Sequence, residues 1–327
     1  MPQVIHPMLA TAIEDPFDDP QWLYEVKWDG YRAITFLDGR STRLVSRNQN
    51  DLTEAYPELH SLGDFVKAHS AILDGEIVAL DQQGRSSFSL MQQRTGVGEG
   101  GRRIRRTRDI IPVVYYVFDL LYFDGYSLLR TELEQRKALL ASVLVPSDTV
   151  RYSDHYLGRG KDLFAAAAQR QLEGIIAKQR KSFYLQKRTR EWLKVKIVKQ
   201  QECVIGGYTE PRGARENFGS IVLGLYDDKG RLIPVGQAGS GFTQQTNAAA
   251  WEHLQKLKTE RDPFFGKVES DRRVHFVKPE LVAEIKFAEW THEGESGAIK
   301  MRAPVFLGLR FDKKPQECRF ETPARLA

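Results

Sequence analysis

Residues 23–32 read LYEVKWDGYR, and this stretch organises the first half of the chain. Its apolar and aromatic residues predict one strand over Leu23–Lys27 and another over Tyr31–Leu37, with Asp29 and Gly30 as the turn between them. Lys27 is therefore expected at a strand end, where the turn that follows holds it at a defined position.

Further strands and short helices follow in mixed order. Residues 71–80 and 113–123 (VVYYVFDLLYF) predict strands, the second most strongly, because β-branched and aromatic residues dominate it. We expect a helix over Thr131–Leu144, capped by Thr131 with Glu134 completing a capping box, and another over Lys161–Leu172. The pattern is typical of an α+β fold.

The sequence changes character near residue 200. From Cys203 onward, short strands alternate with glycine-containing turns, interrupted by one expected helix over Thr246–Lys258. This pattern of short strands and glycine-containing turns predicts a small barrel, for which an OB-fold is a natural candidate. We place the boundary within Ile197–Glu202 and expect two domains, residues 1–198 and 199–327.

Composition narrows the class of protein. The chain has 327 residues, 41% of them hydrophobic, with a formal net charge of +5 that weakly favours a polyanionic partner. Its two cysteines are too few for a disulfide framework and have no metal-ligand spacing. No stretch approaches the roughly 20 apolar residues of a membrane helix, and the first residues form no signal-like apolar segment. These features predict a cytoplasmic protein without membrane association.

Lys27 is the candidate nucleophile. A lysine attacks only after it has lost a proton, so nearby cations or a bound metal are needed to lower its pKa. Arg32, two residues beyond the turn glycine, can return to the same pocket. Taken alone, a lysine at a strand end is more often a solvated surface charge, so this short motif carries little weight by itself.

Two glutamates lie in apolar strands. Glu76 belongs to LDGEIV at residues 73–78, and Glu173 belongs to EGIIAK at residues 173–178. A carboxylate in such a setting is costly unless it is paired or metal-bound, and Mg²⁺ prefers one or two carboxylates together with phosphate oxygens. The simpler alternative for each glutamate is a strand-edge position facing water.

Basic and aromatic residues complete the candidate site. Lys194 and Lys196 alternate with apolar residues, so both project from one strand face and favour a shared anion. Phe118 offers a stacking partner for a purine, and Arg47 lies in a polar turn within reach of ribose or phosphate. The competing interpretations are an exposed strand face, a core phenylalanine and a surface arginine. Basic clusters at residues 102–108 and 178–199 are candidates for contacts to a phosphate backbone.

The order of these segments resembles the nucleotidyltransferase superfamily of ATP-dependent DNA ligases and mRNA capping enzymes. The matches, in chain order, are K-x-D-G-x-R at Lys27–Arg32, S-R-N-x-x-D at Ser46–Asp51, D-G-E at Asp74–Glu76, F-D-L-L-Y at Phe118–Tyr122, E-G-x-x-x-K at Glu173–Lys178, K-x-K at Lys194–Lys196 and R-x-D-K at Arg310–Lys313. Residues 87–94 and 202–208 and the proline-containing final segment are similar to the ligase domain of bacterial end-joining ligase D. The chain is expected to be either a stand-alone ligase or one domain of a larger one.

The resemblance implies an adenylation (nucleotidyltransferase) domain with mixed and antiparallel sheets, followed by an OB-fold β-barrel. It implies an ATP-dependent ligase that seals 5′-phosphate and 3′-hydroxyl breaks in DNA repair, through a lysyl-AMP on Lys27 and a DNA-adenylate. ATP and Mg²⁺ or Mn²⁺ are the implied cofactors, nicked or broken double-stranded DNA is the partner, and a bacterial Ku homologue is a partner by analogy. We expect a monomer whose second domain closes and reopens about Ile197–Glu202.

The resemblance also assigns roles to individual residues. Glu25 and Phe118 would hold adenine, the first by hydrogen bonds and the second by stacking, while Arg32 and Arg47 would contact ribose or the nick phosphate. The metal or ribose hydroxyls would be bound by Glu76 and Glu173, the α-phosphate would be neutralised by Lys178, Lys194 and Lys196, and pyrophosphate would be oriented by Arg310, Asp312 and Lys313.

Three alternatives stay open at this point. An mRNA guanylyltransferase would need GTP recognition, against which the ligase-like Ser46–Asp51 segment argues. An RNA ligase often lacks the OB domain that residues 200–327 are expected to form. A non-catalytic OB-fold nucleic-acid-binding protein would show no reactivity with ATP, which the presence of Lys27 and both glutamates disfavours.

Overall fold

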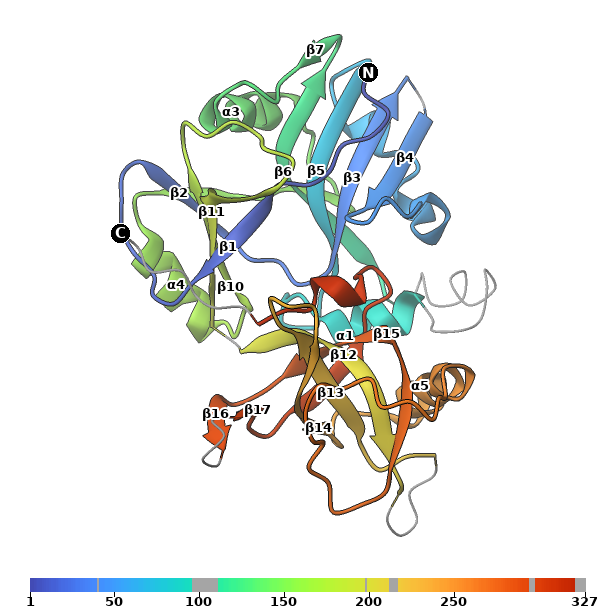
Figure 1. The fold of residues 1–327 in the computed structure, drawn as a ribbon. Helices are drawn as coiled ribbons and strands as arrows, with labels where there is room; N and C mark the ends of the chain where they lie inside the picture. Colours follow the sequence, from blue (N-terminus) through green and yellow to red (C-terminus); the bar gives the residue numbers. More distant parts are fainter. Residues whose placement is uncertain (40, 96–110, 198, 212–216, 294–297, 321–327) are drawn as a thin grey trace. The chain divides into compact units, whose positions relative to one another are not determined.

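The computed structural model describes residues 1–327 except 40, 96–110, 198, 212–216, 294–297 and 321–327 (Figure 1). The chain divides into two compact units, the first covering Met1–Val198 and the second Lys199–Glu321. The basic cluster expected at residues 102–108 and the last residues of the expected second domain lie outside the described part. Within the described ranges, no helix combines the length and apolar character needed to cross a bilayer.

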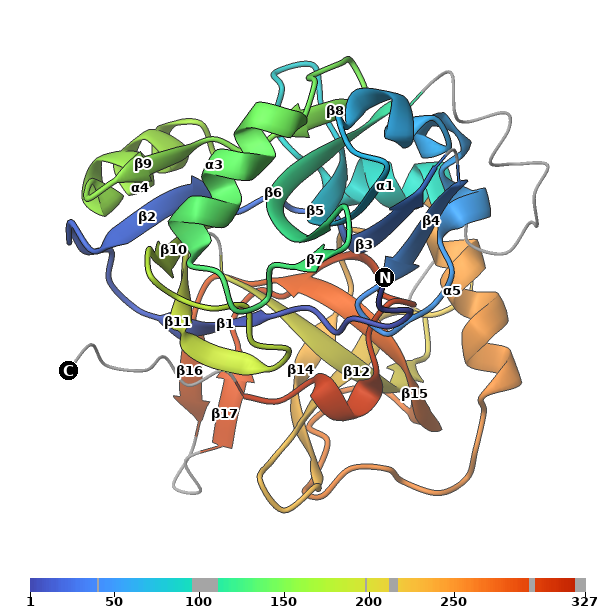
Figure 2. The same ribbon diagram turned by 90° about the horizontal axis from the view of Figure 1, so that it is seen from above.

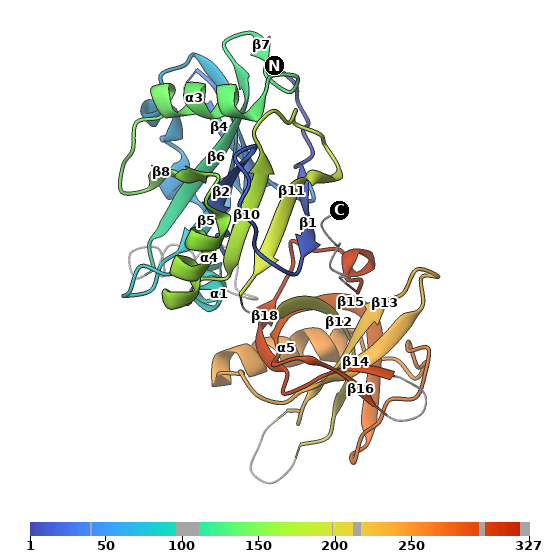
Figure 3. The ribbon, with the colours of Figure 1, turned by 90° about the vertical axis from the view of Figure 1, so that its left-hand side faces the viewer.

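The first unit contains a five-stranded mixed sheet, here called the first sheet. Its order is β1 (Leu9–Ile13), β11 (Arg188–Lys196), β10 (Gly174–Gln179), β2 (Trp22–Val26) and β9 (His155–Leu157). Helix α4 (Gly160–Gln169) lies along β10 and β2 (Figure 3), where its buried Ala167 packs against Tyr24, Ile175 and Val195. The opposite face of this sheet is called the inner face below. Its residues alternate along the strands with those that pack on α4.

A six-stranded second sheet completes the first unit. It consists of β4 (Ser41–Ser46), β3 (Tyr31–Asp38), β5 (Ser70–Ala79), β6 (Val113–Phe123), β7 (Tyr126–Ser127) and β8 (Val150–Tyr152), with β8 parallel to β6. Short 3-10 helices cover Thr53–Ala55, Pro57–Leu59 and Leu62–Phe65. One face packs on α1 (Phe88–Thr95) and on α3 (Leu133–Val143), which runs beside β6 (Figure 2). On the other face, Phe118 meets Trp192 of the first sheet edge-on at 6.2 Å, so the two sheets pack face to face there.

The expected strands at residues 71–80 and 113–123 are confirmed as β5 and β6, and the helix expected over Lys161–Leu172 as α4. The capping box expected at Thr131 and Glu134 is wrong, because α3 begins at Leu133 and its N-cap, Glu132, makes no side-chain capping bond. The carbonyls of Ser182 and Arg180 instead accept from the first amides of the helix at 3.0 Å. A distant loop therefore satisfies the donors that a local cap would have taken.

The second unit is built on a five-stranded antiparallel sheet. Its order is β14 (Leu232–Ala238), β13 (Ile221–Tyr226), β12 (Gln200–Thr209), β15 (Val274–Lys286) and β18 (Val305–Leu309). A bridge between Ser240 and Val305 joins the two edges, so the sheet closes into the small barrel expected of an OB-fold. The remaining elements are α5 (Gln244–Lys256), the hairpin β16 (Trp290–Glu293) and β17 (Ala298–Met301), and a 3-10 helix at Pro315–Glu317.

Candidate active site

Strand register aligns the candidate residues on the inner face of the first sheet. Ile176 of β10 lies opposite Glu25 of β2 on one side and Lys194 of β11 on the other. Two residues before Ile176, Gly174 lies opposite Lys196, and the Gly174 carbonyl accepts a hydrogen bond from the backbone amide of Lys27 at 3.0 Å. Since the intervening residues pack on α4, these side chains project to the inner face, as the alternation of Lys194 and Lys196 predicted.

Lys27 and Glu173 form an ion pair between their ammonium and carboxylate groups. The Lys27 side chain is 21% exposed, whereas that of Glu173 is 7% exposed. Burial and the neighbouring Lys196 lower the pKa of Lys27, but the carboxylates of Glu173 and Asp29 outweigh them and raise it overall. The expectation of a lowered pKa is therefore wrong for this state, because the strand register sets a carboxylate directly on the lysine.

The turn after Lys27 carries the chain from the first sheet to the second. Gly30 lies so close to the backbone carbonyl of Ile77 on β5 that any added Cβ would collide with it. The amide of Asp29 donates to Ser86 Oγ at 3.1 Å, which fastens the turn beside it. Trp28 stacks on Tyr116 of β6, with ring centroids 3.7 Å apart. The glycine is required by close backbone approach, and it anchors the strand end that bears Lys27.

Arg32 faces the same region from the second sheet. It lies opposite Glu76 of β5, which in turn lies opposite Tyr116 of β6. Its guanidinium binds buried Asp74 in a bidentate pair, at 2.6 Å from Nε and 2.7 Å from Nη2, and Tyr184 donates to the same carboxylate at 2.6 Å. Burial opposes the charge, but Asp74 raises the pKa of Arg32, which therefore stays cationic.

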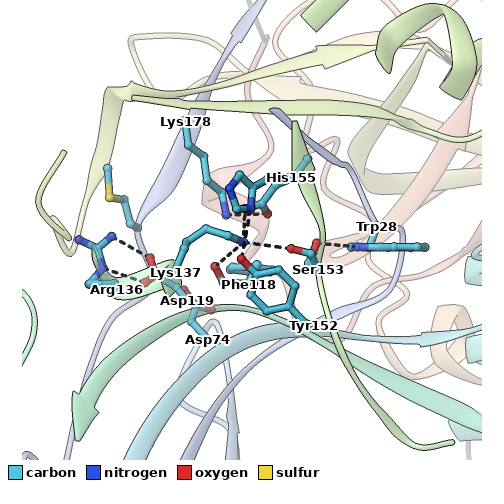
Figure 4. Close-up of polar contacts among 12 residues, drawn as sticks. Trp28, Asp74, Phe118, Asp119, Arg136, Lys137, Tyr152, Ser153, His155 and Lys178 are labelled. Atoms are coloured by element: carbon cyan, nitrogen blue, oxygen red, sulfur yellow. Dashed lines mark hydrogen bonds and ion pairs between the residues drawn. The ribbon is translucent and has the colours of Figure 1, made fainter. Parts of the chain in front are cut away.

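Glu25 lies deeper on the inner face and is 2% exposed. Lys137 Nζ donates to its Oε1 at 2.7 Å, and Lys178 Nζ donates to its Oε2 at 2.9 Å. Burial raises the pKa of Glu25, but the two lysines outweigh it and hold that pKa below its usual range. Figure 4 shows Lys137 reaching into this cluster beside Lys178 and His155.

Phe118 is only 8% exposed and is surrounded by charged groups. Lys178 Nζ lies 4.3 Å and the Arg32 guanidinium carbon 4.6 Å from its ring centroid. A purine that stacks on Phe118 would share the ring with these cations. The next residue, Asp119, forms a buried bidentate pair with Arg136 of α3 at 2.7 and 2.8 Å (Figure 4).

Comparison with known protein families shows to which family the chain belongs. Residues 7–196 match the family described as ATP dependent DNA ligase domain, and residues 214–313 match ATP dependent DNA ligase C terminal region. This chain belongs to the ATP-dependent DNA ligases. The segments from Lys27 to Lys196 lie in the first matched region, and the barrel strands from β13 to β18 lie in the second.

Individual relatives agree with that assignment. The ligase is 36% identical to "Multifunctional non-homologous end joining protein LigD" of Pseudomonas aeruginosa over 331 residues, which are 99% of this chain and 37% of that protein. It is 32% identical to "DNA ligase C1" of Mycolicibacterium smegmatis, covering 97% of this chain and 93% of that protein. The solved structure "mycobacterial DNA ligase D complexed with ATP and MES" matches with a TM-score of 0.68 and 34% identity, covering 96% of this chain and 97% of that one. The ligase thus spans well under half the length of the LigD relative.

The second unit of the ligase holds the predicted residues of the final segment. Arg310 binds Asp312 at 2.8 Å and donates to Glu284 Oε2 at 3.0 Å, and all three side chains are buried. Lys313 Nζ lies 2.8 Å from Glu202 Oε1 in a partly exposed pair. Arg310 and Asp312 therefore stabilise the barrel with each other, while their predicted part in pyrophosphate release stays a prediction.

Arg47 lies in the turn after β4, where the Ser46 amide donates to the Asn50 carbonyl at 2.8 Å and the Asn50 amide donates to Ser46 Oγ at 3.0 Å. The turn presents Arg47 as a half-buried side chain. Its predicted contact with ribose or phosphate stays a prediction.

The fit of a divalent metal rests on Glu76 and Glu173. Within the described ranges, no cluster of three or more histidine, cysteine, aspartate or glutamate side chains is placed to ligate a metal. Two carboxylates suit Mg²⁺, which keeps several waters and binds through one or two carboxylates plus substrate phosphates. Binding of a metal carried in with the nucleotide by Glu76 and Glu173 stays a prediction.

A cavity of about 380 Å³ adjoins Lys27 without including it. It is lined by Val26 and Trp28, the two neighbours of Lys27, together with Tyr116, Tyr152 and residues of α4. Neither Lys27 nor any of the glutamates lines it. Lys27 and the candidate glutamates therefore lie outside this cavity.

Sequence reasoning missed the charged groups beneath the site. Lys137, Arg136, Asp119 and Asp74 are each at most 1% exposed and paired, yet none received a role. A signal was present, because Asp74 and Asp119 interrupt apolar strands and a buried carboxylate requires a partner. Their arginine partners come from β3 and α3, which only the tertiary structure brings alongside.

Proposed function

We propose that this chain seals breaks in double-stranded DNA through a covalent lysyl-AMP on Lys27. Lys27 Nζ attacks the α-phosphorus of ATP, a phosphorus–nitrogen bond forms, and pyrophosphate leaves. A 5′-phosphate oxygen then attacks the phosphorus of lysyl-AMP, the phosphorus–nitrogen bond breaks, and Lys27 Nζ leaves with a proton. Finally the 3′-hydroxyl loses its proton, attacks that 5′-phosphate and expels AMP. The observation that carries the proposal is the pair of Lys27 with Glu173, set beside Lys196 in a chain of the DNA ligase family.

The surroundings of Lys27 determine when it reacts. Glu173 holds the proton on Lys27 Nζ, so the lysine is a latent nucleophile until that carboxylate is drawn away. Lys194 and Lys196, on the same face, supply positive charge where charge builds up on the α-phosphate. Mg²⁺ or Mn²⁺ bound by Glu173 and Glu76 would compete for that carboxylate and neutralise phosphate charge.

Substrate recognition follows from the same face. Glu25 is an ionised acceptor for the amino group of adenine, with Phe118 beneath the base. Arg32 and Arg47 are the proposed contacts to ribose or to the phosphate at the nick. Binding of the DNA backbone is electrostatic, and no sequence readout is expected, because a ligase must join any ends.

The biological setting is part of the proposal. The LigD relatives are named for non-homologous end joining, which supports repair of broken ends. Recruitment by a bacterial Ku homologue stays a prediction. The cytoplasmic location, the monomeric state and the hinge at residues 197–202 stay predictions. RNA ligation and guanylyl transfer are the competing activities within the superfamily.

The first experiment mixes the full chain with α-labelled ATP and Mg²⁺ and follows the protein on a denaturing gel. Label should remain on the wild-type chain, be absent from Lys27→Ala, and be discharged by nicked DNA bearing a 5′-phosphate. Pyrophosphate is added first to remove any bound AMP. Label from GTP but not ATP would indicate a guanylyltransferase, and label from neither would overturn the catalytic proposal.

A further inference from the structure

Lys137 is a buried lysine that belongs to none of the family-like segments. It projects from α3 and is 1% exposed. Its ammonium donates to Glu25 Oε1 at 2.7 Å, to the Ser153 carbonyl at 3.0 Å and to the Phe118 carbonyl at 3.4 Å. Three acceptors match the three N–H groups of an ammonium, so this side chain is fully committed in one geometry.

Lys178, on the other side of the carboxylate, is bound differently. Within the described part of the chain, its only hydrogen-bond acceptor is Glu25 Oε2, at 2.9 Å. Its Nζ also lies 4.3 Å from the ring centroid of Phe118 and 4.2 Å from that of Trp192. The buried indole nitrogen of Trp192 likewise has no hydrogen-bond partner among the described residues. Donors remain here for an acceptor on a bound molecule, whereas Lys137 has none to spare.

Glu25 lies where a bound nucleotide places its base. It precedes Lys27 by two residues on the same strand side, so roughly 7 Å of extended chain separates them. A nucleotide whose α-phosphate meets Lys27 can therefore reach Glu25 with its base. An acceptor at that place discriminates between bases only if its orientation and charge are fixed, because a mobile carboxylate accepts from many donors.

We propose that Lys137 is a positioning residue for base recognition, which locks the Glu25 carboxylate as a fixed acceptor for the exocyclic amino group of adenine. The inference rests on the proposed function, since it assumes that ATP reacts at Lys27. Lys137 touches no substrate and acts entirely through Glu25. The neighbouring Arg136, bound to Asp119, maintains the fold of the same helix and makes no contact with Glu25.

The test compares two triphosphates in the full-length chain. Lys137→Met removes the ammonium and keeps most of the side-chain volume, and the rate of lysyl-AMP formation is measured against the concentration of ATP. A parallel series uses purine riboside triphosphate, which lacks the amino group. Lys137→Met should raise KM for ATP by roughly tenfold or more, the scale of one charged hydrogen bond, with kcat nearly unchanged. KM for purine riboside triphosphate should change by less than about twofold, because that base offers Glu25 nothing to hold.

Two further variants keep the result interpretable. Leu140→Ala destabilises the same helix from the core side, where Leu140 is fully buried, and should leave both KM values unchanged. Lys137→Arg preserves the charge with a different reach. It should fold even if Lys137→Met does not, and should again shift KM for ATP alone.

Equal shifts for both triphosphates, or unchanged KM for ATP in both Lys137 variants, would overturn the inference while leaving the ligase activity in place. If the wild-type chain takes up no label from ATP, the proposed function fails instead.

Discussion

Lys27 and Glu173 form an ion pair although 146 residues separate them in the sequence. Backbone pairing produces this contact, because the Lys27 amide donates to the carbonyl of Gly174, the residue after Glu173. The register of β2 against β10 thus places the Glu173 carboxylate, which holds the proton, against Lys27 Nζ. A lysine held in this way stays cationic until its partner is engaged elsewhere.

Although loss of this carboxylate lets Lys27 release its proton more readily, Glu173→Gln should slow lysyl-AMP formation by about 100-fold at low Mg²⁺ concentration, because the metal loses a ligand; this is the scale on which one preorganised charge acts in an active site. It should also raise the Mg²⁺ concentration needed for half-maximal rate, because a neutral amide binds the metal poorly. Single-turnover labelling across a Mg²⁺ titration measures both effects. Glu134→Gln, which removes a partly exposed pair with Arg180, is the matched control and should behave as wild type. A normal metal dependence in Glu173→Gln would contradict the assignment.

Gly30→Ala should impair both folding and activity. The added Cβ would meet the Ile77 carbonyl, so the turn must move away from β5 and take Lys27 with it. We expect a loss of about 1–3 kcal/mol in unfolding free energy, as for other overpacked sites. Gly84→Ala probes the turn near residue 84, where a Cβ would meet no atom within 4 Å, although its positive φ adds some strain. Urea unfolding of both variants, with labelling assays alongside, separates the two cases, and wild-type labelling by Gly30→Ala would refute the steric argument.

Arg136→Met should destabilise the first unit by about 3–5 kcal/mol, because it leaves Asp119 buried without its partner. The comparison is Arg159→Ala, whose pair with Asp162 is exposed at 74% and 67%, and which should unfold as wild type does. Chemical denaturation followed by circular dichroism measures the difference. Equal stability of the two variants would mean that the buried pair contributes nothing net.

The affinity for ATP should fall as pH rises through about 8. Burial lowers the pKa of Lys178 to about 8, with Lys137 adding to the effect while Glu25 and Asp119 oppose it. His155, which also lies beside this lysine, has a pKa lowered by burial and is neutral in that range (Figure 4). Above that pH Lys178 loses its positive charge and KM for ATP rises. Lys178→Met should have a higher KM at neutral pH and no inflection near pH 8, and an unchanged inflection in that variant would show that another group titrates.

Two neighbouring residues of the final segment should behave differently. Arg310→Met removes the guanidinium that binds the buried carboxylates of Asp312 and Glu284, so the second unit should lose about 3–5 kcal/mol in stability. Lys313→Ala breaks only a partly exposed pair with Glu202, and the unit should stay folded. If Lys313 orients pyrophosphate, its loss slows lysyl-AMP formation but leaves the sealing of pre-adenylylated DNA unchanged. Equal slowing of both steps would place Lys313 elsewhere in the reaction.

The local sequence determined the strands of this ligase and most of its candidate site residues. The apolar runs of β5 and β6 could be predicted as strands, because β-branched and aromatic residues favour strands. The alternation at Lys194 and Lys196 placed both on one face, because successive side chains in a strand point to opposite sides. The order of the short segments identified the family before any contact was known.

Only the tertiary structure decided which charges pair. Lys27 forms an ion pair with Glu173, Arg32 with Asp74, and Glu25 with Lys137. In each case the two partners come from strands or helices far apart in the chain. These choices depend on strand register and on where α3 docks, which follow from the packing of the whole core. The local pattern near Lys27 could therefore predict a nucleophile, while the protonation state of that nucleophile was set by residues that the fold brings to it.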